Sequence, residues 1–180
     1  KNTTMRNLKQ LSFFLFYLLV LQTSYADNYP RNYSVDIIHY AFELSLSDQS
    51  DEILGKASIT VLCKQNGVKQ IRLDLINKTT QRKDKGMSIE SITIGNEPVV
   101  FTHNNDEVFI QLPSPSVAGK EIIFVVKYHG VPESGLRIGP TKYGDRSFFC
   151  DNWPNKARHW LPTVDHPYEK ATSEFIIKAP

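Results

Sequence analysis

The stretch YSVDIIHYAFELSLS, residues 33–47, alternates apolar and polar side chains along most of its length. A period of two is typical of a β-strand with one buried face. A second alternating stretch, ILGKASITVLCKQ at residues 53–65, follows across the polar turn DQSD. The two stretches therefore predict a β-hairpin.

The same pattern continues through most of the chain after residue 65. Further strands are predicted at residues 68–75, 87–99, 107–113, 121–130 and 171–180. The polar, charged connection at residues 77–86 is predicted to be exposed and mobile. No amphipathic helix of three turns and no internal repeat is found. Several short strands separated by turn residues predict an all-β fold, either an antiparallel β-sandwich or an open, saddle-like sheet.

The first 26 residues differ from the rest. A basic flank precedes nine consecutive apolar residues, Phe13 to Leu21, and Ser24-Tyr25-Ala26 follows them. This order is typical of a secretory signal peptide, at residues 1–26. Met5 is the expected initiator, so residues 1–4 are expected to be an extension ahead of it. The alternatives are a buried N-terminal element or a retained anchor, but the apolar run is shorter than a membrane span. We therefore expect a mature domain at residues 27–180, secreted or periplasmic, without a stable membrane anchor.

Charge excludes one class of partner. The chain has 21 Lys and Arg against 19 Asp and Glu. Three of these bases and none of the acids lie in the leader, so the mature part has 18 bases and a net charge of −1. No cationic stripe is present. Nucleic acid is therefore not an expected partner.

Residue types that carry chemistry are present but form no recognised motif. Cys63 and Cys150 either form a disulfide or are two separate buried thiols on different strands. His159 and His166, with Asp165 beside the second, can ligate a metal only if their loop folds back on itself. The preferred interpretation is that both imidazoles bond to backbone or carboxylate groups. Since no H-E-x-x-H, Cys-x-x-Cys or nucleophile motif occurs, we predict no catalytic residue and no metal site in this chain.

The pattern changes at residues 131–170, which are rich in Gly, Pro and aromatic residues. Linkers lack Trp and Phe, so this segment is predicted to be a long ordered loop. Its last part, DNWPNKARHWLPTVDHPYEK at residues 151–170, has several dipeptides at fixed spacings. They are Trp153-Pro154, Ala157-Arg158, Leu161-Pro162, Asp165-x-Pro167 and Lys170-Ala171, followed by a strand that ends in Ala179-Pro180.

This pattern resembles the end of the N-terminal β domain of the aminopeptidase N family. These zinc metallo-aminopeptidases include the leukotriene A hydrolases. The resemblance covers residues 32–180 and is greatest to secreted bacterial members with Asp-Asn-Trp-Pro at this place. It implies a saddle-like β domain that sits against a catalytic domain, with the 151–170 segment as one wall of the active-site cleft.

The resemblance also implies roles for individual residues. Asp151, Asn152 and Trp153 are expected nearest to the free amino group of a peptide substrate. Many relatives carry Glu or Gln where Trp153 stands, so Asp151 or Asn152 is the nearby polar candidate. The other interpretation of Asp151 is a turn or capping residue.

Other residues of the segment are expected to set its shape. Prolines fix backbone torsions, and Arg158 and Asp165 can fasten the loop by charge-assisted hydrogen bonds. Trp153 and Trp160 are large enough to bury surface against a neighbouring domain. The complete set of predicted loop-shaping residues is Pro154, Arg158, Trp160, Pro162, Asp165, His166 and Pro167.

The zinc motif of the family, H-E-x-x-H, and its G-A-M-E-N motif are not among residues 1–180. We therefore expect a non-catalytic N-terminal domain, a fragment of an exported aminopeptidase whose zinc is held elsewhere in the parent enzyme. Alone, this chain is expected to be inactive. The alternatives are a stand-alone secreted β-sandwich that serves as a binding or adaptor module, and a carbohydrate-binding domain.

Overall fold

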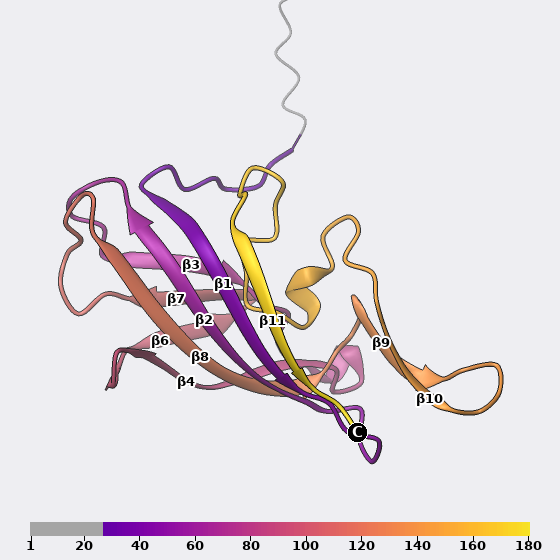
Figure 1. Ribbon diagram of the computed structural model, residues 1–180. Helices are drawn as coiled ribbons and strands as arrows, with labels where there is room; N and C mark the ends of the chain where they lie inside the picture. The colour runs from indigo at the N-terminus through magenta and orange to yellow at the C-terminus, as the bar shows by residue number, and fades with distance from the viewer. Residues whose placement is uncertain (1–26) are drawn as a thin grey trace, which may run out of the picture. The chain divides into compact units, whose positions relative to one another are not determined.

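A computed structural model describes residues 27–180 of the chain. The predicted signal peptide, residues 1–26, lies outside the described residues. Residues 27–30 have no regular secondary structure. Arg31–Pro180 forms one compact unit, and the architecture that follows is that of this unit (Figure 1).

Three β-sheets make up the unit. The largest has six strands in the order β11-β1-β2-β8-β4-β5, and the second has three in the order β3-β7-β6. The third is a hairpin of two strands, β9 and β10. The strands of the large sheet are β1 (Val35–Ser45), β2 (Ile53–Cys63), β4 (Gly86–Ile94), β5 (Glu97–Pro98), β8 (Glu121–Val131) and β11 (Thr172–Lys178). The others are β3 (Gln70–Asp74), β6 (Phe101–Asn104), β7 (Glu107–Gln111), β9 (Leu136–Pro140) and β10 (Arg146–Cys150), with two 3-10 turns, η1 (Thr80–Arg82) and η2 (Ala157–His159).

The predicted hairpin of residues 33–65 is confirmed as β1 and β2, which pair antiparallel. Their register shifts between Ile37 and His39, which marks a β-bulge. Before the bulge the buried positions are odd-numbered, as at Ile37, and after it they are even-numbered, as at Tyr40 and Phe42. The bulge therefore explains why the alternation in the first quoted stretch changes phase in the middle.

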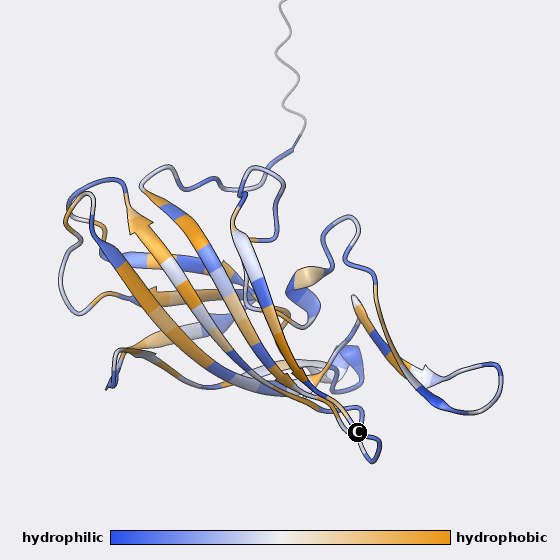
Figure 2. Cartoon of the chain, in the orientation of Figure 1, coloured by the Kyte–Doolittle hydropathy of each residue, from blue (hydrophilic) through white to orange (hydrophobic). Residues whose placement is uncertain are grey.

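The core lies between the inner faces of the six-stranded and three-stranded sheets. Fully buried residues from both sheets form one cluster, which includes Ile59, Val61, Ile71, Val108 and Phe124. Figure 2 shows the alternation of apolar and polar residues along the strands of the large sheet. Each buried aliphatic or aromatic side chain contributes roughly 1.5–3 kcal/mol relative to an exposed one.

The all-β class and the open sheets agree with the sequence prediction, but one strand pair differs. β11 runs parallel to β1, with His39 opposite Thr172 and Ser45 opposite Lys178. All other neighbouring strands are antiparallel. The alternation within residues 171–180 could not reveal this direction, since it depends on the path of the preceding loop.

Two predicted loops need correction. Residues 131–170 were predicted to be one long ordered loop, but β9 and β10 form a hairpin there, with Leu136 opposite Cys150. The connection at residues 77–86 was expected to be mobile. It is instead fastened to the β6–β7 turn, because Arg82 Nη2 lies 2.6 Å from Asp106 Oδ2 and the amide of Asn77 donates to Asp106 Oδ1.

The two cysteine thiols are free. Cys63 is buried at the end of β2, and Cys150 is exposed at the end of β10. Of the two alternatives, the structure therefore has two separate thiols. That alternative expected both to be buried, but only Cys63 is. In residues 27–180, no helix has the length and apolar character that crossing a membrane requires.

Candidate functional site

The connecting loop, residues 151–170, joins β10 to β11 and contains the short turn η2. Its tip, residues 151–155, is mostly exposed. Its base, residues 160–163, is buried. The loop therefore combines a solvent-facing end with an end that belongs to the core of the unit.

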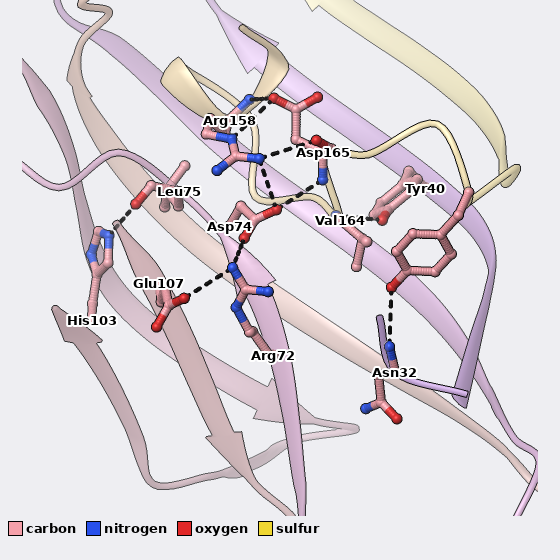
Figure 3. Close-up of polar contacts among 11 residues, drawn as sticks. Asn32, Tyr40, Arg72, Asp74, Leu75, His103, Glu107, Arg158, Val164 and Asp165 are labelled. Carbon is pink, nitrogen blue, oxygen red and sulfur yellow. Dashed lines mark hydrogen bonds and ion pairs between the residues drawn. The ribbon is translucent and has the colours of Figure 1, made fainter. Parts of the chain in front are cut away.

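Asp74, the last residue of β3, holds the base of the loop, and its side chain has no exposed surface. One carboxylate oxygen accepts a hydrogen bond from Arg72 Nη2 over 2.7 Å. The other accepts a hydrogen bond from the amide of Asp165 over 3.0 Å and lies 3.4 Å from Arg158 Nη2 (Figure 3). A carboxylate removed from water is thus paired with two guanidinium groups, as burial of a charge requires.

Arg158 and Asp165 are also bonded directly. Asp165 Oδ2 accepts hydrogen bonds from the backbone amide of Arg158 over 3.1 Å and from its Nε over 3.3 Å. Arg158 Nη2 donates to the backbone carbonyl of Asp165 over 3.1 Å. Hydrogen bonds to charged groups contribute about 1.5–3 kcal/mol each when they are shielded from water. The six-residue segment between the two residues is therefore closed into a fixed shape.

Backbone contacts complete the attachment of the base. Asp74 and Thr163 exchange two backbone hydrogen bonds of 2.7 and 3.1 Å. The amide of Ile76 donates to the carbonyl of Arg158 over 2.8 Å, and the amide of Val164 donates to the hydroxyl of Tyr40 over 2.9 Å. Burial raises the pKa of the Tyr40 hydroxyl, so this acceptor stays neutral.

The three residues expected nearest to a substrate amine lie together at the tip. Trp153 is 78% exposed. Its amide donates to Asp151 Oδ1 over 3.2 Å, and Asp151 Oδ2 lies 3.9 Å from Lys156 Nζ. Asn152 Oδ1 accepts a hydrogen bond from Trp160 Nε1 over 2.9 Å. Asp151 is therefore a turn residue, as one interpretation had it, and it also presents a carboxylate to solvent.

Trp160 does not offer a surface for a neighbouring domain, which corrects that expectation. It is 4% exposed and lies in the core, with its ring centroid 6.3 Å from that of Phe175. Gly135 allows this packing, because a Cβ there would lie 2.3 Å from the Lys156 carbonyl oxygen and 2.9 Å from the Trp160 ring. Of the two tryptophans, only Trp153 remains available to an external partner.

The two histidines of the loop have separate partners. His159 Nδ1 lies 2.9 Å from Glu133 Oε2, and burial lowers the pKa of the His159 imidazole against the opposing effect of Glu133. His166 Nδ1 accepts a hydrogen bond from the amide of Tyr168 over 3.2 Å. Among residues 27–180, no group of three or more His, Cys, Asp or Glu side chains could hold a metal ion.

The prolines occupy different surroundings. Pro162 is buried in the base, whereas Pro154 and Pro167 are exposed. The peptide bond between Trp153 and Pro154 is cis. Of the three predicted loop-shaping prolines, only Pro162 is removed from solvent.

Sequence reasoning missed the residues outside the loop that hold it. Asp74, Arg72 and Tyr40 come from β3 and β1, and Glu107 of β7 adds a carboxylate 3.0 Å from Arg72 Nη2. A charged residue next to a predicted strand end ordinarily faces solvent. No local signal marks Asp74 as buried, since the loop that covers it lies about 90 residues further along the chain.

Residues 36–180 match the family model described as the peptidase M1 N-terminal domain. No curated protein matches the chain.

Solved structures share the fold. An M1 zinc metallopeptidase from Deinococcus radiodurans is 22% identical, with a TM-score of 0.66, and the match covers 82% of this chain and 33% of that chain. A mutant M1 zinc metallopeptidase from the same organism, bound to a Tyr-Ser-Ala substrate, is 22% identical with a TM-score of 0.65 and the same coverage. Yeast LTA4 hydrolase in complex with bestatin is 18% identical with a TM-score of 0.69, covering 88% of this chain and 26% of that chain. The chain thus spans about a third or a quarter of the length of these proteins.

Proposed function

Since this chain belongs to the peptidase M1 N-terminal domain family, we propose that it is the non-catalytic N-terminal domain of an exported zinc-dependent aminopeptidase. The parent enzyme removes N-terminal residues from peptides, and this domain forms one wall of its active-site cleft. The partners in this proposal are the catalytic domain of the same enzyme and the peptide substrate.

The contrast between the tip and the base of the connecting loop is the observation that supports this function. The base is fixed by the buried Asp74 carboxylate and by the Arg158–Asp165 pair. The tip presents Trp153 and Asp151 to solvent. A wall of a binding cleft needs groups that face the ligand on a backbone that does not move, because ordering a flexible loop would lower the affinity.

Asp151 is the better of the two polar candidates for the substrate amine. Its carboxylate is 48% exposed and carries the negative charge that an ammonium group requires. The side-chain oxygen of Asn152 is already used by Trp160. That oxygen can accept a second hydrogen bond, but the amide carries no net charge with which to balance an ammonium group. Asn152 therefore serves to position Trp160, and Trp153 offers an aromatic face beside the amine.

Zinc enters this proposal only as a cofactor of the parent enzyme. The described residues contain no ligand cluster for a metal, and the 180-residue sequence contains no H-E-x-x-H. The residues of this chain do not fit a zinc site, so we assign no chemical step to zinc through them. What the chain contributes is the binding and orientation of the substrate's amino terminus.

Export is part of the same proposal and rests on the apolar leader at residues 13–21. Cleavage of the leader after Ala26 would give a mature protein that begins at Asp27. Mass spectrometry of the protein purified from the periplasm or medium of an expressing bacterium tests this directly. An uncleaved chain in the cytoplasm would contradict export without affecting the assignment of the cleft wall.

The main test measures aminopeptidase kinetics on the complete protein that the gene encodes, with zinc content determined on the same sample. We expect hydrolysis of an amino-acid p-nitroanilide and none of its N-acetylated form. Asp151→Asn is expected to raise KM about tenfold with a smaller effect on kcat, which corresponds to the loss of one charge-assisted hydrogen bond. Asp145→Asn is the matched control, because Asp145 is an exposed acid in the β9–β10 turn.

The outcomes separate the proposal from its alternative. If the protein hydrolyses neither substrate and binds no zinc, the stand-alone binding module is favoured and the aminopeptidase assignment is wrong. If the protein is active but Asp151→Asn has the same KM as Asp145→Asn, the assignment of the amine to Asp151 is wrong.

A further inference from the structure

A lysine lies beside the Asp151 carboxylate, just past the tip of the connecting loop. Lys156 Nζ is 3.9 Å from Asp151 Oδ2, and in the described part of the chain no other acid forms an ion pair with Lys156. The side chains of Lys156 and Asp151 expose 32 and 48% of their surface. The domain itself therefore leaves both charges within reach of a ligand.

The backbone is fixed at both members of this pair. The amide of Asp151 donates to the carbonyl of Gly135 over 2.8 Å. The amide of Lys156 donates to the carbonyl of Asn152 over 2.9 Å, and the carbonyl of Lys156 accepts from the amide of His159 over 3.2 Å. The two side chains therefore start from fixed positions, and a negative and a positive group are kept side by side.

The two carboxylate oxygens of Asp151 are already in use. Oδ1 accepts the hydrogen bond from the amide of Trp153 over 3.2 Å, and Oδ2 faces Lys156. An ammonium group that binds Asp151 must share the carboxylate with Lys156, whose like charge opposes it. The pair has no net charge, so it attracts a ligand that carries only an ammonium group less than Asp151 alone would.

A ligand with both charges does not meet this opposition. The α-ammonium group and the side-chain carboxylate of an N-terminal Asp or Glu are only a few bonds apart. If the ammonium group binds Asp151 and the carboxylate binds Lys156, every charge lies beside one of opposite sign. All the contacts are then charge-assisted hydrogen bonds, which are stronger than bonds between neutral groups.

We propose that Lys156 determines substrate specificity, and that it selects peptides with an acidic N-terminal residue by binding the side-chain carboxylate while Asp151 binds the amine. The selection rests on the proposed function, because it requires the catalytic domain of the parent enzyme. Lysine suits this role, since its flexible stem lets the ammonium group turn from Asp151 to a nearby carboxylate. Arg158 is not free to act in the same way, because Asp74 and Asp165 hold its guanidinium group.

The test compares acidic substrates with their uncharged isosteres, using the complete protein that the gene encodes. The p-nitroanilides of Asp and Asn form one pair, and those of Glu and Gln form the other. We expect the wild-type enzyme to prefer the acidic member of each pair by about two- to fivefold in kcat/KM, the effect of one partly exposed ion pair.

Three variants separate the charge of Lys156 from its other contacts. Lys156→Met is expected to lower both ratios to about one or below, because it removes the partner of the substrate carboxylate. Lys156→Arg keeps the charge and should retain the preference. Lys142→Met is the matched control and should leave both ratios unchanged, because Lys142 is an exposed lysine in the β9–β10 turn. Circular dichroism and the unfolding midpoint show whether each variant is folded.

The outcomes that contradict the role of Lys156 differ from those that contradict the proposed function. Equal kcat/KM values within each pair of substrates for the wild type would overturn the proposal for Lys156. A preference that Lys156→Met leaves intact, or that Lys156→Arg loses as fully as Lys156→Met, would overturn it equally. In these cases the aminopeptidase function stands, because the substrates are hydrolysed. If the wild type hydrolyses none of the four substrates and no alanine p-nitroanilide, the proposed function is wrong and the role of Lys156 with it.

Discussion

The backbone amide of Asp165 donates a hydrogen bond to the buried carboxylate of Asp74 over 3.0 Å, although 91 residues separate them. This contact joins the end of β3 to the loop that precedes β11. The same carboxylate faces Arg72 from its own strand and Arg158 from the loop. One side chain therefore links the three-stranded sheet to the segment that carries the candidate site.

Replacement of Asp74 by Ala is expected to lower the free energy of unfolding by about 3–5 kcal/mol, because two guanidinium groups would lose their buried counter-charge. Urea denaturation followed by tryptophan fluorescence measures this loss. Asp145→Ala, at an exposed acid, should change stability by less than about 0.5 kcal/mol. A loss below about 1 kcal/mol for Asp74→Ala would mean that the contacts of Asp74 are not what holds the loop.

The role of Asp74 also shows where sequence reasoning ends for this chain. Alternation identified most strands of the two larger sheets, because each strand buries one face and the period of two is local. On that pattern, Ile71 and Leu73 face the core, and Asp74 reads as a solvent-facing residue. It is buried because the connecting loop folds over it, and that contact has no signature in the neighbouring residues.

The hairpin of β9 and β10 was missed for a related reason. Gly, Pro and aromatic residues at 131–150 are typical of loops, and the strands LRIGP and RSFFC are too short to show a clear period of two. The turn between them is closed by the Thr141 amide, which donates to the Asp145 carbonyl. In the connecting loop, residue types indicated a fixed shape, but only the structure separates the buried Trp160 from the exposed Trp153.

The two tryptophans of the loop should respond differently to the same substitution. Trp160→Ala is expected to cost about 3–5 kcal/mol of stability, because it leaves a cavity in the core and removes the partner of Asn152. Trp153→Ala should change stability by less than about 0.5 kcal/mol, since that ring is exposed. Chemical denaturation of the two variants side by side makes the comparison. Equal losses would contradict the placement of Trp153 at a free tip.

Gly135 should be less tolerant of Ala than Gly144. Both have positive φ, of 77° and 93°, so each Ala pays about 1–2 kcal/mol for the left-handed backbone. A Cβ at Gly135 additionally meets the Lys156 carbonyl and the Trp160 ring, whereas nothing lies within 4 Å at Gly144. Gly135→Ala is therefore expected to cost about 1–3 kcal/mol more than Gly144→Ala. Thermal unfolding measures the difference, and equal losses would show that the loop can move away from β9.

The stability of the domain should fall as the pH drops from about 7 to 5, in part because of His103. Its Nε2 lies 2.8 Å from the carbonyl oxygen of Leu75, and burial lowers the pKa of the imidazole below its usual value near 6.5. The unfolded chain then binds a proton at a higher pH than the folded one. This contribution to stability is complete above pH 6.5 and is lost as the pH falls through the lower, folded pKa. His103→Gln keeps a donor to Leu75 without the titration, so its unfolding free energy should fall less between pH 7 and 5.

His159 should act in the same direction, because burial also lowers its pKa. The variant in which both His103 and His159 are replaced by Gln should therefore show the smallest change of unfolding free energy with pH. Urea denaturation at each pH measures the change. If wild type and both variants lose the same stability over this range, carboxylates rather than these histidines govern it.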